Sequence, residues 1–371
     1  MKFQLNMENG IANRGNLTRM KNLMKRAQAG EALTIGFLGG SITQGSLSST
    51  PQLCYAYHVY EWWVQTFPQA TFTYVNAGIG GTTSQFGVAR VESDLLVKQP
   101  DFVITEFSVN DESTEHFLET YEGLIRKIYQ SKTQPAMLIV HNVCYDNGGN
   151  AQLQHARVGR YYQIPCVSMQ STIYPEVVAG RIANRDITPD DLHPNDDGHA
   201  LVASVITHFL AKVQGELDAP EAPEAEFPAP MTANSYENSV RYQNDNCNPI
   251  VDGFAADISE QSDITDCFKH GWTAGKLGAK ICFDIEGKGI SVQYRKSVKQ
   301  PAPIAEVVVD GDTDHAIRLD ANFDETWGDK LELDTITEHT DMKKHTVEIT
   351  LVETHDDDVV PFYLVSVIGA Y

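Results

Sequence analysis

The sequence lacks the patterns that would indicate a metal site, a membrane span or export. Its six cysteines are far apart and form no CxxC pair, so neither zinc nor another metal is assigned. No stretch reaches the ~18 consecutive apolar residues of a membrane span, and no apolar run follows the early lysine, as a secretory signal would require. We therefore expect reduced structural thiols, no cofactor and a cytoplasmic location.

Basic residues are scarce: 28 Lys and Arg against 50 Asp and Glu give the 371 residues a net charge of −22. Nucleic-acid phosphates and anionic lipid headgroups repel such a chain, so neither is expected as a main partner. The imbalance is uneven, because residues 1–215 hold 16 basic and 19 acidic residues, whereas residues 216–371 hold 12 and 31. The change from −3 to −19 predicts a domain boundary near residue 216.

Residues 1–215 alternate between short apolar runs and segments of helical periodicity. Near-continuous apolar runs are typical of strands buried on both faces of a parallel sheet, and five occur, at 33–38, 72–75, 102–105, 137–140 and 164–169. Helical spacing of apolar residues is found at 17–27, 115–131 and 197–213. The alternation predicts an α/β domain with a parallel sheet.

The chain beyond residue 215 has a different pattern. Residues 216–235 begin ELDAPEAPEAEFPAP and predict a linker or an extended strap. Residues 236–371 contain short strand-like runs separated by turn signals, with no convincing helix after residue 260, and predict an all-β sandwich or jelly roll. The runs lie at 281–285, 290–294, 306–309, 316–319, 331–333, 347–351 and 363–368.

Four short motifs in the first domain carry residues suited to catalysis. Residues 39–43, 76–84 and 108–111 each follow a predicted strand, and residues 190–195 precede the last predicted helix. Open α/β sheets bind ligands at the carboxyl edge of their strands, so the first three motifs are expected to meet there. Each motif alone also occurs in ordinary turns; their joint occurrence in this order is what indicates a site.

The residue types predict acyl transfer. Ser41 follows two glycines at a strand end and would be the nucleophile, which a base must activate. His193 can be that base, and Asp190, three residues earlier, can hold the far ring nitrogen. The oxyanion that forms on the attacked carbonyl needs donors, and the amides of Ser41 and Gly81 with the side chain of Asn110 can supply them.

These motifs resemble those of the SGNH hydrolases, the superfamily that includes the GDSL-type esterases. The resemblance covers roughly residues 30–213 and implies a three-layer, flavodoxin-like fold. Carried over residue by residue, it assigns Ser41 as nucleophile, Gly81 and Asn110 to the oxyanion hole, and Asp190 and His193 to the triad.

The chain departs from the family pattern at two positions. Gly40 stands where the GDSL pattern has Asp, as in carbohydrate-esterase relatives, and Val109 stands where Gly usually precedes the Asn. Asp191 is a rival to Asp190, although it lies two residues before the histidine rather than three.

The β-rich second domain resembles family-35 carbohydrate-binding modules. The two-domain layout is similar to that of acetyl-mannan esterases of carbohydrate esterase family 17. This resemblance implies a carbohydrate esterase, the removal of O-acetyl groups from manno-oligosaccharides, and an acetylated oligosaccharide as the partner.

Sugar rings stack on aromatic side chains, and acids and amides bond their hydroxyl groups. Trp327 and Asp324 share an aromatic-acidic loop and are candidate substrate contacts, as is His141 at a predicted strand end. Core packing is the alternative for tryptophan and applies also to the second candidate, Trp272. Acidic loops at 310–314 and 356–358 suit Ca²⁺ ligation, but solvation explains them better.

The leading hypothesis is a serine acetylesterase acting on acetylated sugars. A lipase, lysophospholipase or thioesterase could use the same triad, and a non-catalytic carbohydrate-binding protein would need none of it. The sequence leaves open which sugar and hydroxyl position are deacetylated, and whether the chain forms a homo-oligomer.

Overall fold

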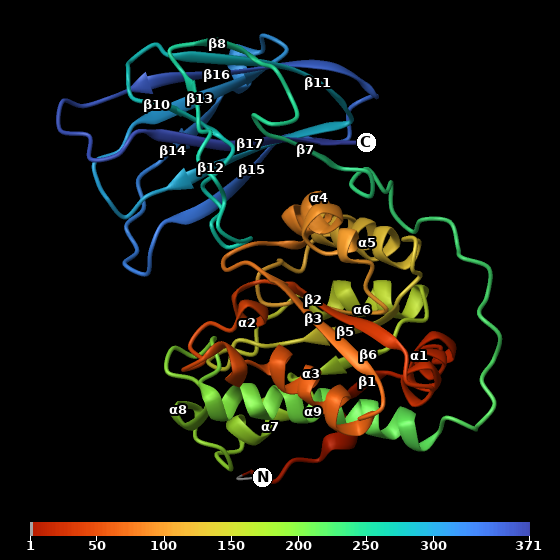
Figure 1. Ribbon diagram of the computed structural model, residues 1–371. Helices are drawn as coiled ribbons and strands as arrows, with labels where there is room; N and C mark the ends of the chain where they lie inside the picture. Colours follow the sequence, from red (N-terminus) through yellow and green to blue (C-terminus); the bar gives the residue numbers. More distant parts are fainter. Residues whose placement is uncertain (1–2) are drawn as a thin grey trace. The chain divides into compact units, whose positions relative to one another are not determined.

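Residues 3–371 are described by the computed structural model, and the chain divides by its contacts into two units (Figure 1). The first ends at Asn234, and the second runs from Ser235 to Tyr371. All six cysteines are free thiols, and each is buried or half-buried. No helix within the described residues is both long and apolar enough to cross a membrane.

The first unit is built on a six-stranded sheet in the order β1-β6-β5-β4-β2-β3. Five strands are parallel and coincide with the five predicted runs, which confirms the α/β expectation. The sixth, β1, pairs antiparallel with β6. The strands are β1 (Ile11–Asn13), β2 (Ala32–Gly39), β3 (Thr71–Gly78), β4 (Phe102–Glu106), β5 (Ala136–His141) and β6 (Cys166–Ser168).

Helices cover both faces of this sheet, as Figure 1 shows. On one face lie α1 (Thr18–Gln28), α3 (Tyr55–Thr66) and α9 (Asp196–Gly215); on the other lie α4 (Ser84–Asp94), α5 (Glu115–Tyr129) and α6 (Gln152–Tyr161). Because both faces are covered, every residue of β4 and β5 is buried. Short helices complete the unit: α2 (Ser41–Gln44), α7 (Ile173–Val178), α8 (Asn184–Ile187), η1 (Met7–Gly10), η2 (Pro51–Leu53) and η3 (Leu96–Lys98).

The strand order decides where a ligand can bind. Across the sheet, the five parallel strands lie in the order β3-β2-β4-β5-β6. The chain therefore moves from β2 to one side, where it forms β3, and then crosses to the other side of β2, where it forms β4. Doubly wound sheets leave a crevice outside the carboxyl ends of the strands where the chain changes sides in this way. The loops after β2, β3 and β4 therefore border the place where this fold puts its ligands.

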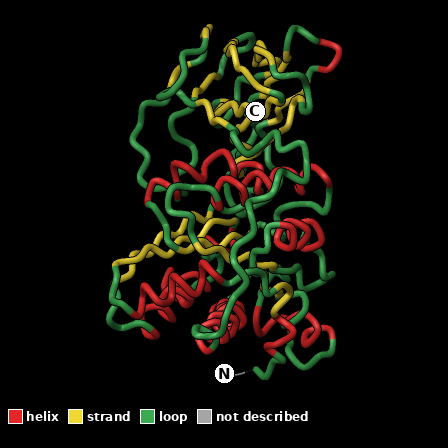
Figure 2. The backbone as a smooth tube through the Cα atoms, turned by 90° about the vertical axis from the view of Figure 1, so that its right-hand side faces the viewer, coloured by secondary structure: helices red, strands yellow, loops and turns green. Residues whose placement is uncertain are grey.

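The acidic, proline-rich segment belongs to the first unit and packs on the surface of its α/β domain; we call residues 216–232 the strap. Figure 1 shows it as an extended line beside α1, and Figure 2, seen from that side, shows it without helix or strand. Glu221 accepts hydrogen bonds from Arg14 at 2.8 Å and lies 3.3 Å from the ammonium of the buried Lys21. Glu224 accepts from Arg19 at 2.7 Å. The acidic residues of the strap thus neutralise a basic face of the first unit.

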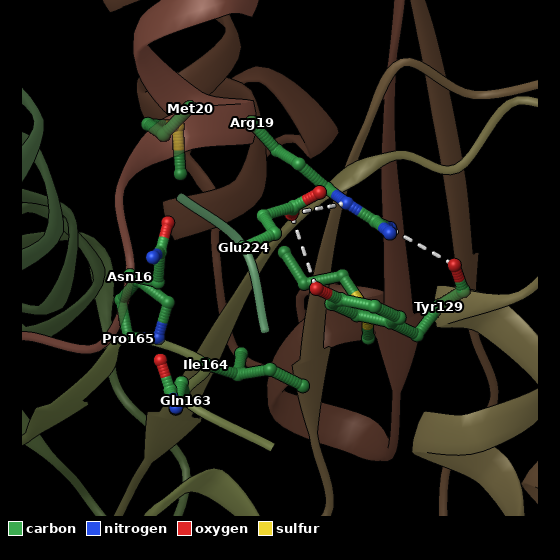
Figure 3. A pocket seen from close by; sticks show the side chains of 9 residues that line it. Asn16, Arg19, Met20, Tyr129, Gln163, Ile164, Pro165 and Glu224 are labelled. Carbon is green, nitrogen blue, oxygen red and sulfur yellow. Dashed lines mark hydrogen bonds and ion pairs between the residues drawn. The ribbon is translucent and has the colours of Figure 1, made fainter. Parts of the chain in front are cut away.

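Aromatic contacts hold the next part of the strap. Phe227 stacks on Tyr129 and on Tyr162, with ring centroids 4.9 and 5.1 Å apart, and the Arg126 guanidinium lies 4.8 Å from its ring. Figure 3 shows the small pocket beside these contacts, where the Tyr129 hydroxyl donates to Glu224. Arg19 also donates to Glu224 and to the Tyr129 carbonyl, so three of the residues that line this pocket are bonded to one another.

The second unit is a sandwich of two antiparallel sheets, as expected from the sequence. The sheet orders are β15-β12-β17-β10-β9, with β7 also pairing β17, and β14-β13-β16-β11-β8. Trp272 lies in the core between the sheets, with its ring 5.2 Å from that of Phe283. The elements are β7 (Val240–Tyr242), β8 (Ile250–Asp252), β9 (Ala255–Ala256), β10 (Trp272–Ala274), β11 (Lys280–Gly287), β12 (Gly289–Lys296), β13 (Ile304–Val309), η4 (Thr313–His315), β14 (Ile317–Asp320), β15 (Lys330–Thr337), β16 (Lys343–Glu353) and β17 (Phe362–Ala370).

Candidate active site

Ser41 lies at the carboxyl end of β2, where it begins the single turn of α2. Gly40 before it accommodates the Asn110 side chain, because a Cβ at position 40 would come within 2.3 Å of the Asn110 Oδ1. A larger residue at position 40 would therefore displace Asn110. This close approach gives a physical reason for the glycine that departs from the GDSL pattern.

Ser41, His193 and Asp190 form one hydrogen-bonded array. The Ser41 hydroxyl lies 2.8 Å from Nε2 of His193, and Nδ1 of His193 lies 2.7 Å from Oδ2 of Asp190. With Nδ1–H donated to the carboxylate, Nε2 keeps the lone pair that can accept the serine proton. The structure thus brings together the three residues that the sequence singled out as a triad.

The loop around Asp190 stabilises its charged form. Its Oδ1 accepts the N–H groups of His193 at 2.7 Å and Leu192 at 3.1 Å. Partial burial opposes ionisation, but these bonds and the one from the His193 ring outweigh it, so the pKa of Asp190 lies below its ordinary value. The carboxylate therefore remains charged when the imidazole takes up a proton.

Asp191, the rival acid, points to other partners. Both of its oxygens accept hydrogen bonds from Arg185, at 2.8 and 2.6 Å, and Asn184 donates to the first. Its backbone carbonyl accepts the Tyr145 N–H at 2.7 Å. Asp191 consequently fixes the loop that carries Asp190.

The three predicted oxyanion donors lie at the ends of neighbouring strands. Within residues 3–371, neither the Ser41 N–H, the Gly81 N–H nor the Asn110 Nδ2 donates to another group of the chain. The loop that carries Gly81 passes beside the nucleophile, because a side chain built on Gly80 would lie 3.7 Å from the Ser41 Cβ. Gly81 itself has φ of +68°, which favours glycine.

Val109, which precedes Asn110 in the turn after β4, has an unstrained backbone conformation. Its side chain packs against the hydrophobic core of the first unit, and it is absent from the positive-φ residues. The turn is held by the N–H groups of Asn110 and Asp111, which both donate to the Phe107 carbonyl, at 3.0 and 2.9 Å. A glycine is therefore not required at position 109.

Two further residues, to which the sequence motifs assign no role, position the glycine-rich loop. Gln44 accepts the Gly80 N–H at 2.7 Å through its side-chain oxygen. Asn76 donates to the Thr43 carbonyl at 2.8 Å and accepts the Gly78 N–H at 2.9 Å. The only available signal was their place within the motifs, Gln44 one turn after Ser41 and Asn76 at the end of β3.

Buried titratable groups lie behind the site. Burial raises the pKa of Glu106 to about 7, although Ser108 donates to its Oε1. Burial lowers the pKa of His199 to about 4; its Nε2–H donates to the Ser46 carbonyl, and its Nδ1 accepts the Tyr55 N–H. His199 is thus a neutral support for the loop after Ser41.

The three candidate substrate contacts have different environments. His141 is fully buried, and burial lowers its pKa well below the ordinary range, so its ring has no accessible surface for a substrate. Trp327 is 61% exposed on a loop of the second unit, with its ring 5.2 Å from Phe323. Asp324 on that loop accepts a hydrogen bond from Gln300 at 3.2 Å.

Metal ligands do not cluster in the part of the chain that the structure describes: residues 3–371 contain no group of three or more His, Cys, Asp or Glu side chains that could hold an ion.

Comparison with known proteins identifies relatives over the whole chain. Two solved structures of a two-domain esterase (CEX) active on acetylated mannans are similar. One, co-crystallised with mannopentaose, is 71% identical with a TM-score of 0.96, and the match covers 99% of this chain and 98% of that chain. The other is 72% identical with a TM-score of 0.97 and 99% coverage of both. A search of curated proteins found no match.

A family model matches the same region as the catalytic motifs. The model of the GDSL-like lipase/acylhydrolase family matches residues 37–201, which include Ser41, Gly81, Asn110, Asp190 and His193. The match lies within the first unit, and the solved structures extend the similarity to the β-sandwich. The chain therefore belongs to the GDSL-like lipase/acylhydrolase family, as a two-domain member with an N-terminal α/β unit and a C-terminal β-sandwich.

Proposed function

We propose that this protein is a serine esterase that removes O-acetyl groups from acetylated manno-oligosaccharides. The observation that carries the proposal is the hydrogen-bonded array of Ser41, His193 and Asp190 beside three free donors. The activity of the similar two-domain esterase on acetylated mannans supports the substrate class. A neutral, hydroxyl-rich substrate also suits a chain with a net charge of −22.

The reaction proceeds in two acyl transfers. The Ser41 oxygen attacks the acetyl carbonyl carbon while its proton passes to Nε2 of His193. The Ser41 and Gly81 amides and the Asn110 side chain donate to the oxyanion that forms. The bond from the carbonyl carbon to the sugar oxygen then breaks, and His193 returns the proton to that oxygen, which leaves acetyl-Ser41 and a free sugar hydroxyl.

Water completes the cycle. His193 removes a proton from a water molecule, whose oxygen attacks the acetyl-Ser41 carbonyl. The second oxyanion uses the same donors, the bond to the serine oxygen breaks, and His193 returns the proton to Ser41. Acetate is released, and Asp190 stabilises the imidazolium in both halves without taking a proton.

We also propose that the second unit is a carbohydrate-binding module of the family-35 type and that Trp327 and Asp324 contact sugar. An exposed tryptophan can stack on the apolar face of a pyranose, and a nearby carboxylate can accept hydrogen bonds from its hydroxyl groups. The exposure of Trp327 supports this role, whereas the burial of Trp272 supports core packing for that residue.

The first experiment is the Ser41→Ala substitution, with acetate release from acetylated manno- and xylo-oligosaccharides followed by mass spectrometry. We expect kcat to fall by about 10⁴-fold or more, because triad members act as a unit. The Ser204→Ala variant, which removes a hydroxyl bonded to the backbone of α9, is the matched control and should retain full activity.

Full activity of Ser41→Ala would overturn the mechanism. Comparing acetyl with octanoyl esters on the wild type tests the substrate class, since a lipase-like enzyme would prefer the longer chain. Stoichiometric sugar binding without acetate release would instead favour a binding protein.

A further inference from the structure

The Asn110 and Gly81 donors come from separate loops, and one buried carboxylate connects these loops. Asp111 follows Asn110 directly, and its Oδ1 accepts the Ser84 N–H at 2.8 Å. Ser84 begins α4, three residues after Gly81. The Asp111 side chain is fully buried, so water does not compete for this bond. The distance between the two loops is therefore set by a contact inside the protein.

The other oxygen of Asp111 is held from helix α6. Nε2 of His155 lies 3.0 Å from Oδ2 of Asp111, and the His155 side chain is also fully buried. The imidazole stacks on Tyr121 of α5, with ring centroids 3.6 Å apart and planes 10° apart. The Ala151 N–H, just before α6, donates to the Ser108 carbonyl at 2.6 Å. Each carboxylate oxygen thus has a fixed partner on a different helix.

Stabilisation of the oxyanion depends on donor groups that are held in fixed positions. Donors act because they are already placed where the negative charge forms, and a displacement well under 1 Å weakens them. Neither Asp111 nor His155 has a role in the proton transfers proposed above. Their buried pair connects the Asn110 turn to the start of α4, and through α4 to the loop that carries Gly81.

We propose that Asp111 is a positioning residue for the esterase reaction: it fixes the Asn110 side chain relative to the Gly81 amide, and His155 fixes the orientation of its carboxylate. The inference deepens the proposed function and rests on it. A role in stability alone would lower the melting temperature without changing the turnover of molecules that stay folded.

The test compares Asp111→Ala, Asp111→Asn and Asn110→Ala in the full chain with p-nitrophenyl acetate, well below each melting temperature. We expect Asp111→Ala to lower kcat about 10- to 100-fold and to change KM less than about threefold, because the oxyanion forms after binding. Asp111→Asn keeps an acceptor for the Ser84 N–H, so its loss should be smaller, about three- to tenfold.

A double-mutant cycle separates positioning from independent effects. If Asp111 acts through the oxyanion donors, the loss of kcat in the Asp111→Ala/Asn110→Ala double variant should be much smaller than the product of the two single losses. His155→Gln, which retains a donor near the Nε2 position, should lose less activity than His155→Leu.

Glu122→Gln is the matched control. Glu122 is another fully buried carboxylate that accepts two N–H groups, those of Met231 and Thr232, but in the strap. Its substitution should lower the melting temperature while kcat stays within about twofold, because it touches neither donor loop.

A folded Asp111→Ala with kcat within about twofold of the wild type, or losses that simply multiply in the double variant, would overturn the positioning role. If Asp111→Ala does not fold, unchanged kcat in both Asp111→Asn and His155→Leu would overturn it. An inactive wild type would refute the proposed function as well, whereas an active wild type with unaffected Asp111 variants would refute this inference alone.

Discussion

Asp190 and Asp191 are adjacent acids of the same size, and their partners decide which of them serves His193. Asp190 bonds the imidazole and two N–H groups of its own turn. Asp191 adopts φ of +70°, which Asp tolerates better than most residues, and its carboxylate is taken up by Arg185. The backbone between the two residues therefore separates a catalytic role from a supporting one.

Asp190→Asn and Asp191→Asn should consequently differ in effect. We expect Asp190→Asn to lower kcat on acetyl esters about 10³- to 10⁴-fold, because an amide no longer fixes the His193 tautomer or stabilises the imidazolium. Asp191→Asn should stay within about fivefold of the wild type, since an acceptor for Arg185 remains. Equal losses in kcat would contradict the assignment of Asp190.

Sequence spacing allowed the triad to be predicted but not its supports. Asp190 and His193 lie three residues apart, and Ser41 follows a strand and two glycines, so local geometry indicates their roles. Asp111 and His155 lie 44 residues apart and meet only because α6 packs beside the Asn110 turn. A contact that depends on tertiary packing leaves no period or motif in the sequence.

At the scale of elements, the strands of four or more residues were predicted, and of the strands of two or three residues only β6 was. The apolar runs of the parallel sheet and the seven runs of the sandwich all overlap strands, although the run at 164–169 extends beyond β6 at both ends and the run at 316–319 begins one residue before β14. Elements of two or three residues, such as β1, β8 and β9, are too short to show a period of two, and their pairing partners define them. Composition identified the strap as an extended segment but not the surface it covers.

The strap should contribute measurable stability through Glu221. The hydrogen bond from Arg14 lowers the pKa of Glu221 to about 2, from an ordinary 4.5, so the folded state favours the carboxylate. A depressed pKa stabilises the fold fully above about pH 4.5, and the stabilisation is lost as the pH falls to about 2. We expect Glu221→Gln to lower the free energy of unfolding by about 1–2 kcal/mol at pH 7.

The measurement is denaturant unfolding of the full chain at several pH values, with hydrogen exchange of the α1 amides as a local readout. The difference from the wild type should shrink between pH 4.5 and 2. Glu226→Gln provides the control, because it removes the same charge from an exposed position of the strap. An equal loss in Glu226→Gln would mean that net charge, rather than the contact with Arg14, is responsible.

For the whole molecule, the net charge of each unit changes when the boundary is placed after Asn234, as in the structure, rather than at residue 216. Residues 216–234 carry five acidic and no basic residues, and they belong to the first unit. That unit then holds 16 basic and 24 acidic residues, a net charge of −8, and the second holds 12 and 26, a net charge of −14. Part of the apparent acidity of the second half therefore neutralises a basic face of the first.

The proposed sugar contact of Trp327 predicts a selective effect of Trp327→Ala. We expect KM for acetylated manno-oligosaccharides to rise about tenfold, because a stacking surface is lost. Turnover of p-nitrophenyl acetate, which carries no sugar, should be unchanged. Leu277→Ala removes another exposed apolar side chain of the second unit and should alter neither value; an unchanged KM in Trp327→Ala would remove that residue from the sugar site.

The strap also limits how this region can vary in length. Acidic, proline-rich linkers usually accept insertions and deletions at little cost. Here Glu221, Glu224 and Phe227 follow one another at intervals of three residues, and each has its own partner on the first unit. One inserted residue would shift the segment beyond it by ~3.3 Å, enough to separate a carboxylate from its guanidinium. Substitutions of the residues between Glu221, Glu224 and Phe227 are therefore tolerated more readily than insertions or deletions there.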